Sequence, residues 1–151
     1  MNISKSTGLT RANLGAIFLA SLAIRFLNWM TIEDLSLYMF ASDSPIYWDG
    51  AKAWLDAGYF SRPNGVTFVA ETERVPLYHL FLIPFRWIFG NALWPVLVGQ
   101  SILDAGTCML IGLLGAQLTR ATGLLAGLLA AAWPNLVIHS HLILSDSLFL
   151  F

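Results

Sequence analysis

Three short polar segments hold the residue types that could do chemistry in this chain. Asp43 and Tyr47 fall in the first segment, Glu73 and Arg74 in the second, and Asp146 in the third. A carboxylate can take the proton of an attacking hydroxyl, and a guanidinium presents a fork of donors that fits a phosphate. The second segment could bind a metal ion or a lipid phosphate, and a solvated loop end explains it equally well.

Composition and spacing exclude several other kinds of site. The chain has one cysteine, Cys108, which excludes a disulfide framework and a four-thiolate zinc site. His139 and His141 are two positions apart and do not face one another on a helix, so we do not expect both to bind zinc. The sequence has no phosphate-binding glycine loop, no serine–histidine–acid arrangement and no nucleotide fingerprint.

The elements that position these residues are expected to lie in a membrane. The 151 residues are 57% hydrophobic and only 11% charged, whereas a soluble domain has about 25% charged residues. This leaves too little polar surface for a soluble globule and predicts an all-α integral membrane protein. The formal net charge of −1 provides no basic face for nucleic acid.

The charges separate a polar loop from apolar segments. Residues 31–75 contain seven acidic and three basic residues, whereas the next 76 residues contain four charged residues in all. The apolar run 14–30 predicts a first spanning helix. Lys5 and Arg11 precede it, which predicts a cytoplasmic N-terminus and an outer loop at 31–75. A cleaved signal peptide is the rival interpretation, but the run does not end in a small-x-small site.

Three further apolar stretches and the start of a fourth follow the loop. Stretch 76–89 is short and contains two prolines and Arg86, so we expect it to be re-entrant or a short helix. Segments 93–118 and 122–139 are then spans, which keeps Arg120 inside. Segment 142–151 is expected to be a truncated span, since the sequence stops inside it.

Other features have structural explanations. The pattern from Pro45 to Gly58 predicts an amphipathic helix on the outer face, with Asp43 or Ser44 as its cap. Capping is the simplest role for Asp43 on this pattern alone. Gly123 and Gly127 form a small-xxx-small pattern that allows close helix packing.

Two ionisable residues, Arg25 and Asp104, lie in or beside apolar runs. Ionisable groups at membrane depth are costly and mark either functional sites or buried pairs. We expect a structural pair or a side chain that extends to the interface.

The order of three motifs resembles a known family. The first is DSPIY at 43–47, with Ala51 and Gly58 after it, and the second is ERVPLY at 73–78. The third joins TGLLAGLLAAAWP at 122–134 to LSDSLF at 144–149. Together they resemble the polyprenyl-phosphate-dependent membrane glycosyltransferases of the GT-C type (family 39), which include protein O-mannosyltransferases and the aminoarabinose transferase. Ser44 stands where the family has a second acidic residue.

The resemblance implies a function and roles for five residues. It implies the N-terminal transmembrane module (1–151) of a GT-C-type helix bundle that moves a sugar from polyprenyl phosphate to an acceptor hydroxyl. Asp43 would be the catalytic base, Tyr47 would help to position it, and Arg74 would hold the phosphate. Glu73 and Asp146 would complete the outer-face site, around a divalent ion if one is used.

The same resemblance implies partners and a location. The donor is a polyprenyl-phosphate sugar, and the acceptor is a lipid, glycan or protein. The location is the cytoplasmic (inner) membrane, crossed several times, and the chain is expected to be a fragment that is inactive alone. The alternatives are a small non-catalytic membrane protein or assembly partner and, ranked last, a transporter fragment.

Overall fold

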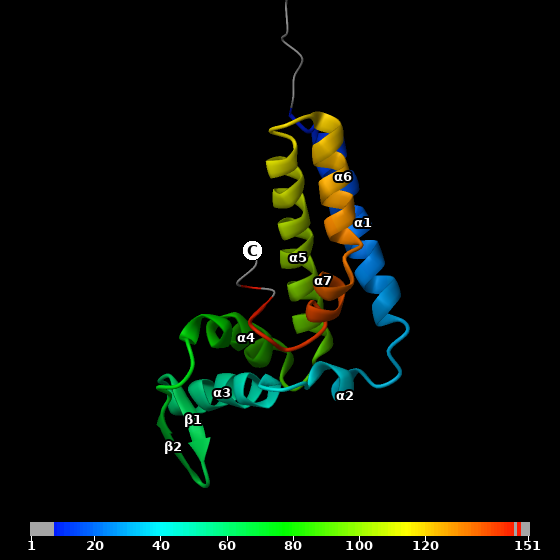
Figure 1. The fold of residues 1–151 in the computed structure, drawn as a ribbon. Helices are drawn as coiled ribbons and strands as arrows, with labels where there is room; N and C mark the ends of the chain where they lie inside the picture. The colour runs from blue at the N-terminus through cyan, green and yellow to red at the C-terminus, as the bar shows by residue number, and fades with distance from the viewer. Residues whose placement is uncertain (1–7, 147, 149–151) are drawn as a thin grey trace, which may run out of the picture.

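The computed structural model describes residues 8–146 and 148 and is mostly helical (Figure 1). Helices α1, α5 and α6 stand side by side as a bundle, and the other elements lie across its lower end (Figure 1). The elements are α1 (Arg11–Trp29), α2 (Leu35–Met39), α3 (Ser44–Ala57), β1 (Ser61–Asn64), β2 (Thr67–Ala70), α4 (Pro76–Phe89), α5 (Trp94–Gly115), α6 (Arg120–Ala131) and α7 (Pro134–His139).

Helices α1 and α5 are the two in the described residues that are long and apolar enough to cross a membrane. Their 19 and 22 residues correspond to lengths of roughly 29 and 33 Å at 1.5 Å per residue. A hydrocarbon core is about 30 Å thick. Both helices thus have about the length needed to cross it. Their ends also lie within a few residues of the predicted boundaries 14–30 and 93–118.

Small residues let the three bundle helices approach closely. A Cβ atom on Gly123 would lie 2.6 Å from the Cβ of Ala116 and 2.6 Å from the carbonyl oxygen of Gly112. A Cβ on Gly127 would lie 2.6 Å from the side chain of Ile17 on α1. The small-xxx-small pattern therefore lies at the contact of α6 with both neighbours, as its packing interpretation predicts.

A buried ion pair links the same three helices. Arg25 on α1 is completely buried and pairs with Asp104 on α5, which is 1% exposed. The Arg25 Nε donates to Asp104 Oδ2 at 2.6 Å, and its Nη1 donates to Ser21 Oγ at 2.6 Å and to the carbonyl of Ala131 at 3.3 Å. The structural pair expected from the sequence is confirmed, and it also reaches the last residue of α6.

The segment predicted as a span at 122–139 is not one continuous helix, because the structure divides it into α6 and α7. Proline disfavours helical conformation in the residue before it, and Trp133, which precedes Pro134, is extended with ψ 118°. Helix α6 has 12 residues, or roughly 18 Å, which is too short to cross a bilayer. Arg25 then supplies a donor to the carbonyl of Ala131 at the end of α6.

The expected helix at 142–151 does not begin at residue 142. Residues 142–145 form turns and bends, and the amide of Ile143 donates to the carbonyl of Met39 at 3.0 Å. Ile143 is buried with Met39 in the core that joins α2, α3, α4 and the start of α5. Residues 147 and 149–151 lie outside the described residues.

The loop expected at 31–75 contains a hairpin that departs from the all-α prediction. Strands β1 and β2 pair antiparallel, from Ser61 opposite Ala70 to Asn64 opposite Thr67. Gly65 has a φ of +62° as the first of the two turn residues, which is the conformation that a type II′ turn requires there. The Asn64-Gly65 pair was the available sequence signal for this hairpin.

The two ends of the bundle differ in what they hold. Arg120 at the start of α6 donates from its Nε to Asn13 Oδ1 near the start of α1 at 3.0 Å. Helices α2, α3, α4 and α7 and the hairpin lie at the opposite end (Figure 1). Helix α4 covers residues 76–89 and packs on α3 rather than along the bundle, so α5 runs back towards the end where α1 begins.

The ion pair makes a first prediction. Replacing Arg25 with Met leaves Asp104 buried without its partner, which should lower the free energy of unfolding by about 3–5 kcal/mol. The double variant Arg25→Met/Asp104→Leu should recover most of this loss. Thermal unfolding in detergent, followed by circular dichroism, measures both, with the partly exposed Arg62→Met as control. Equal stability of Arg25→Met and the unchanged chain would contradict a structural role for the pair.

Candidate functional site

Asp43 and Arg74, 31 positions apart, form an ion pair on the polar part of the molecule. The Arg74 Nη2 lies 2.9 Å from Asp43 Oδ2, and both side chains are about one-third exposed. Asp43 occupies the N-cap position of α3 but makes no side-chain capping bond. Ser44 Oγ instead donates to the carbonyl of Ala41 at 2.6 Å and accepts from its amide at 3.1 Å. The Asp43 carboxylate therefore does not cap α3, contrary to its simplest expected role, and reaches Arg74.

Tyr47 lies one helical turn beyond Asp43 and is buried. Its ring contacts Tyr78 edge-on at a centroid distance of 5.0 Å and His79 at 5.3 Å. The amide of Tyr47 donates to the carbonyl of Asp43 at 3.3 Å, but within the described residues no side-chain hydrogen bond joins the two. Tyr47 therefore holds α3 against α4 beneath the ion pair, and any effect on Asp43 acts through the position of the helix.

Glu73 belongs to an open cleft beside the ion pair. Its Oε1 lies 2.7 Å from Arg62 Nη1 on β1, and its amide donates to Glu71 Oε1 at 2.7 Å. The cleft has a volume of about 260 Å³ and is lined by Pro45, Ile46, Asp49, Arg62, Pro63, Glu71, Glu73 and Arg74. Its lining has three carboxylates and two guanidiniums. Such walls can accept hydrogen bonds from the hydroxyls of a polar ligand and donate to one anionic group.

Asp146 is not brought into contact with the other predicted site residues. Its Oδ2 lies 3.0 Å from His139 Nδ1, close to the end of α7. It does act electrostatically on Tyr78, whose pKa is raised well above its ordinary value of 10.0 mainly by burial and further by Tyr47 and Asp146. Asp146 therefore pairs with His139 and is not part of the Asp43–Arg74 pair.

His79 is a site residue that the sequence reasoning missed. It is completely buried, and its Nε2 has no hydrogen-bond partner. A Cβ on Gly50 would lie 2.6 Å from this nitrogen, so α3 can pass His79 only with glycine there. Burial lowers the pKa of His79, while the carbonyl of Val75 and the charge of Glu71 oppose the shift. A histidine within the apolar stretch 76–89 was the available signal.

A metal site is not preassembled in this region. The described residues contain no group of three or more histidine, cysteine, aspartate or glutamate side chains placed to hold a metal ion. The divalent ion considered on the resemblance therefore has no ready ligand set in residues 8–146 or at 148.

Comparison with family models, with curated proteins and with solved structures finds no match for this chain. The function of the chain is therefore inferred from the geometry of the site and from the motifs.

Burial of His79 predicts a pH dependence of stability. The unfolded chain protonates this imidazole near its ordinary pKa of 6.5, whereas the folded chain does so only at lower pH. The unfolded state therefore binds more protons in this range, and the free energy of unfolding should fall as the pH drops below 6.5.

Denaturant unfolding between pH 7 and pH 5 measures this slope, which should be smaller in His79→Gln. Burial also lowers the pKa of His141, and that contribution remains in both chains. The half-exposed His139→Gln is the matched control. An unchanged slope in His79→Gln would show that His79 is not the titrating group.

Proposed function

We propose that this chain carries the acceptor-activating site of an integral membrane glycosyltransferase, which moves a sugar from a polyprenyl-phosphate donor to an acceptor hydroxyl. The observation that carries the proposal is the 2.9 Å pairing of Asp43 with Arg74 at the polar end of the molecule. These are the residues for which the motif resemblance implies the base and the phosphate-binding cation. They come from two motifs separated by a helix and a hairpin.

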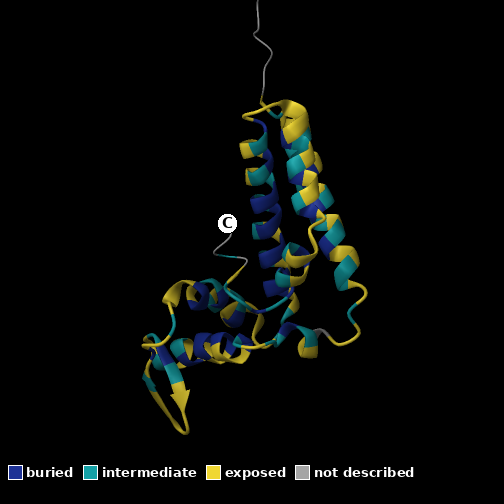
Figure 2. Cartoon of the chain, viewed as in Figure 1, coloured by how far each residue is buried: buried dark blue, intermediate teal, exposed yellow. Residues whose placement is uncertain are grey.

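Several features support placement in a membrane. Helices α1 and α5 have suitable length and composition, and much of α1 and α6 is exposed or half-buried (Figure 2). Large apolar side chains on these surfaces are exposed, including Leu19, Leu27 and Leu129 at 60% or more. Arg120 lies at the end of the bundle opposite the acidic segment, and positive charge favours the cytoplasmic side. The Asp43–Arg74 site would then face outward.

The proposed reaction assigns one task to each member of the pair. The acceptor oxygen attacks the anomeric carbon as its proton passes to the Asp43 carboxylate. The bond between that carbon and the phosphate oxygen breaks, and the phosphate leaves with the electron pair, which inverts the anomeric carbon. Arg74 stabilises the charge that grows on the phosphate. Only one of its five N–H donors is needed for Asp43, so the remaining donors can bind the phosphate.

The neighbouring residues have positioning tasks under this proposal. Glu73 holds Arg62 at the cleft wall, and Tyr47 packs α3 onto α4 beneath Asp43. The excess of carboxylates in the cleft suits an acceptor rich in hydroxyls. Asp146 pairs with His139 and has no contact with the Asp43–Arg74 pair, so it is given no task in the reaction.

Substitution of the pair tests the catalytic proposal. In membranes that contain the natural gene product, Asp43→Asn should lower sugar transfer from a radiolabelled polyprenyl-phosphate donor by roughly 10²–10⁴-fold, because no carboxylate takes the proton. Arg74→Gln should slow sugar transfer, because the charge that grows on the leaving phosphate loses the cation that stabilises it. Glu33→Gln, an exposed carboxylate variant outside the site, is the matched control. Normal transfer by Asp43→Asn would contradict the proposal and favour a non-catalytic membrane protein or assembly partner.

Cysteine labelling tests the membrane orientation independently. Val66 is fully exposed at the hairpin turn, and Ala121 is exposed at the opposite end of the molecule. A membrane-impermeant maleimide should label Val66→Cys in intact cells stripped of any outer barrier, and Ala121→Cys only after permeabilisation. Native Cys108 is completely buried and provides the unlabelled background. Equal labelling of both positions without permeabilisation would overturn the topology.

A further inference from the structure

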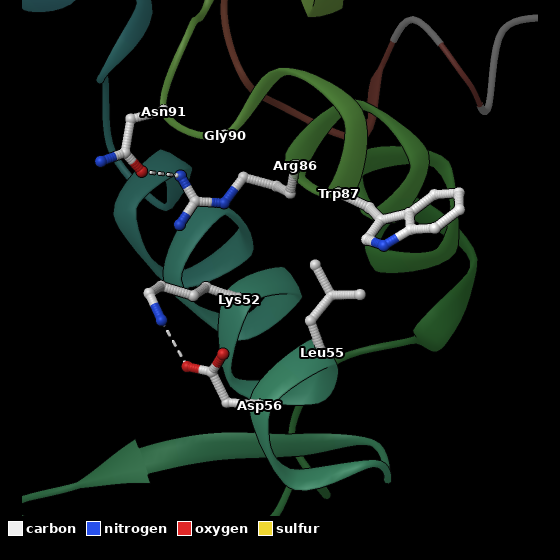
Figure 3. A pocket seen from close by; sticks show the side chains of 7 residues that line it. All are labelled: Lys52, Leu55, Asp56, Arg86, Trp87, Gly90 and Asn91. Carbon is white, nitrogen blue, oxygen red and sulfur yellow. Dashed lines mark hydrogen bonds and ion pairs between the residues drawn. The ribbon is translucent and has the colours of Figure 1, made fainter.

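A second cleft lies between α3 and α4, and it shares no lining residue with the cleft beside Asp43 and Arg74. It has a volume of about 430 Å³ and is lined by Lys52, Leu55, Asp56, Arg86, Trp87, Gly90 and Asn91. Figure 3 shows Arg86 reaching into it from α4 and Lys52 from α3, with Leu55 and Trp87 as its apolar side.

Arg86 is a cation held in place with most of its donors unused. Its side chain is 7% exposed, lies over the ring of Trp48 at 4.1 Å, and donates from Nη1 to Asn91 Oδ1 at 2.8 Å. This is the one hydrogen bond of the guanidinium to a described protein group, out of five N–H donors. An oriented guanidinium with free donors fits the oxygens of a phosphate.

Charged groups on α3 surround the Arg86 guanidinium. Lys52 pairs with Asp56 one turn along α3, and both side chains are about half exposed. The lining residues thus carry two positive charges and one negative charge. Asp49 and Asp56 act on the charge of Arg86 from the side of α3. With Asp49 counted, the charges around the cleft balance, so binding of a phosphate depends on the unused donors of Arg86 and not on a net positive charge.

The cleft adjoins an apolar helix face at Trp87. One face of α4 carries four large apolar side chains, as their positions along the helix require. All are at least 48% exposed: Leu77, Leu80, Trp87 and Ile88. Helix α4 lies on the bundle side of α3 (Figure 1). In the orientation of the proposed function, this face meets the membrane, and the cleft lies at the level of the headgroups, where tryptophan is favoured.

We propose that the cleft at Arg86 and Lys52 binds the phosphodiester of an anionic membrane phospholipid, whose acyl chains pass Trp87 onto the exposed apolar face of α4. This inference rests on the membrane placement in the proposed function and not on sugar transfer. Arg86 supplies the oriented donors, Lys52 the second positive charge, and Trp87 the boundary between headgroup and acyl chain. The bound lipid would anchor the polar segment that holds the Asp43–Arg74 pair.

Native mass spectrometry of the full chain in detergent tests the proposal with phosphatidylglycerol as the probe. Phosphatidylglycerol adducts should form at lower lipid concentration than phosphatidylcholine adducts. Arg86→Gln should weaken phosphatidylglycerol binding roughly tenfold, as expected for loss of charged hydrogen bonds, and Lys52→Gln should weaken it by a smaller factor. Arg120→Gln, which removes an exposed guanidinium at the opposite end of the bundle, is the control.

The outcomes separate this site from its alternatives. Equal binding of both lipids, or unchanged phosphatidylglycerol binding in both cleft variants, would overturn the proposal. Displacement of the lipid by millimolar inorganic phosphate would indicate a free-phosphate site instead. If circular dichroism shows that Arg86→Gln does not fold, the exposed Lys52→Gln decides. Asp43→Asn should bind lipid normally, so loss of transfer and loss of lipid binding are distinguishable, and cysteine labelling reports membrane placement separately.

Discussion

The buried pair of Arg25 and Asp104 is the interaction on which the rest of the structure depends. A single ionised side chain enclosed by apolar helices is very unfavourable, whereas a hydrogen-bonded pair is tolerated. Because Arg25 also donates to Ser21 and to the carbonyl of Ala131, its position determines the register of α1, α5 and the end of α6. The helix can break before Pro134 although Ala131 is buried, because the carbonyl of Ala131 accepts a hydrogen bond from Arg25.

Contacts at the lower end of the bundle connect the three bundle helices to the polar segment. The amide of Ile143, which follows α7, donates a hydrogen bond to the carbonyl of Met39. The Ile143 side chain lies in the core shared by α2, α3, α4 and α5. The close contact between Gly50 on α3 and the His79 ring on α4 determines how closely the two helices approach. Asp43 stands at the start of α3 and Arg74 just before α4, so the contact of these helices determines their separation. A site on the surface is thus positioned by packing beneath it.

The two clefts of the polar segment differ in the groups that line them. One cleft contains Arg74 and an excess of carboxylates, which suits hydroxyl groups and one departing phosphate. The other has Arg86 with unused donors beside an exposed tryptophan, which suits a lipid that stays bound. Under the proposals made above, the first cleft performs transfer and the second holds the segment at the membrane surface.

The sequence by itself determined the local elements, because these depend on nearby residues. The spacing from Pro45 to Gly58 predicted α3, and the two glycines at 123 and 127 predicted close packing. The isolated charges at 25 and 104 predicted either a structural pair or side chains that extend to the interface, and the structure shows the pair. Only the tertiary structure decided that Asp43 pairs with Arg74 and does not cap α3, that His79 is buried against Gly50, and that Asp146 lies apart from the pair. These outcomes depend on contacts between residues far apart in the chain, whose geometry no local pattern encodes.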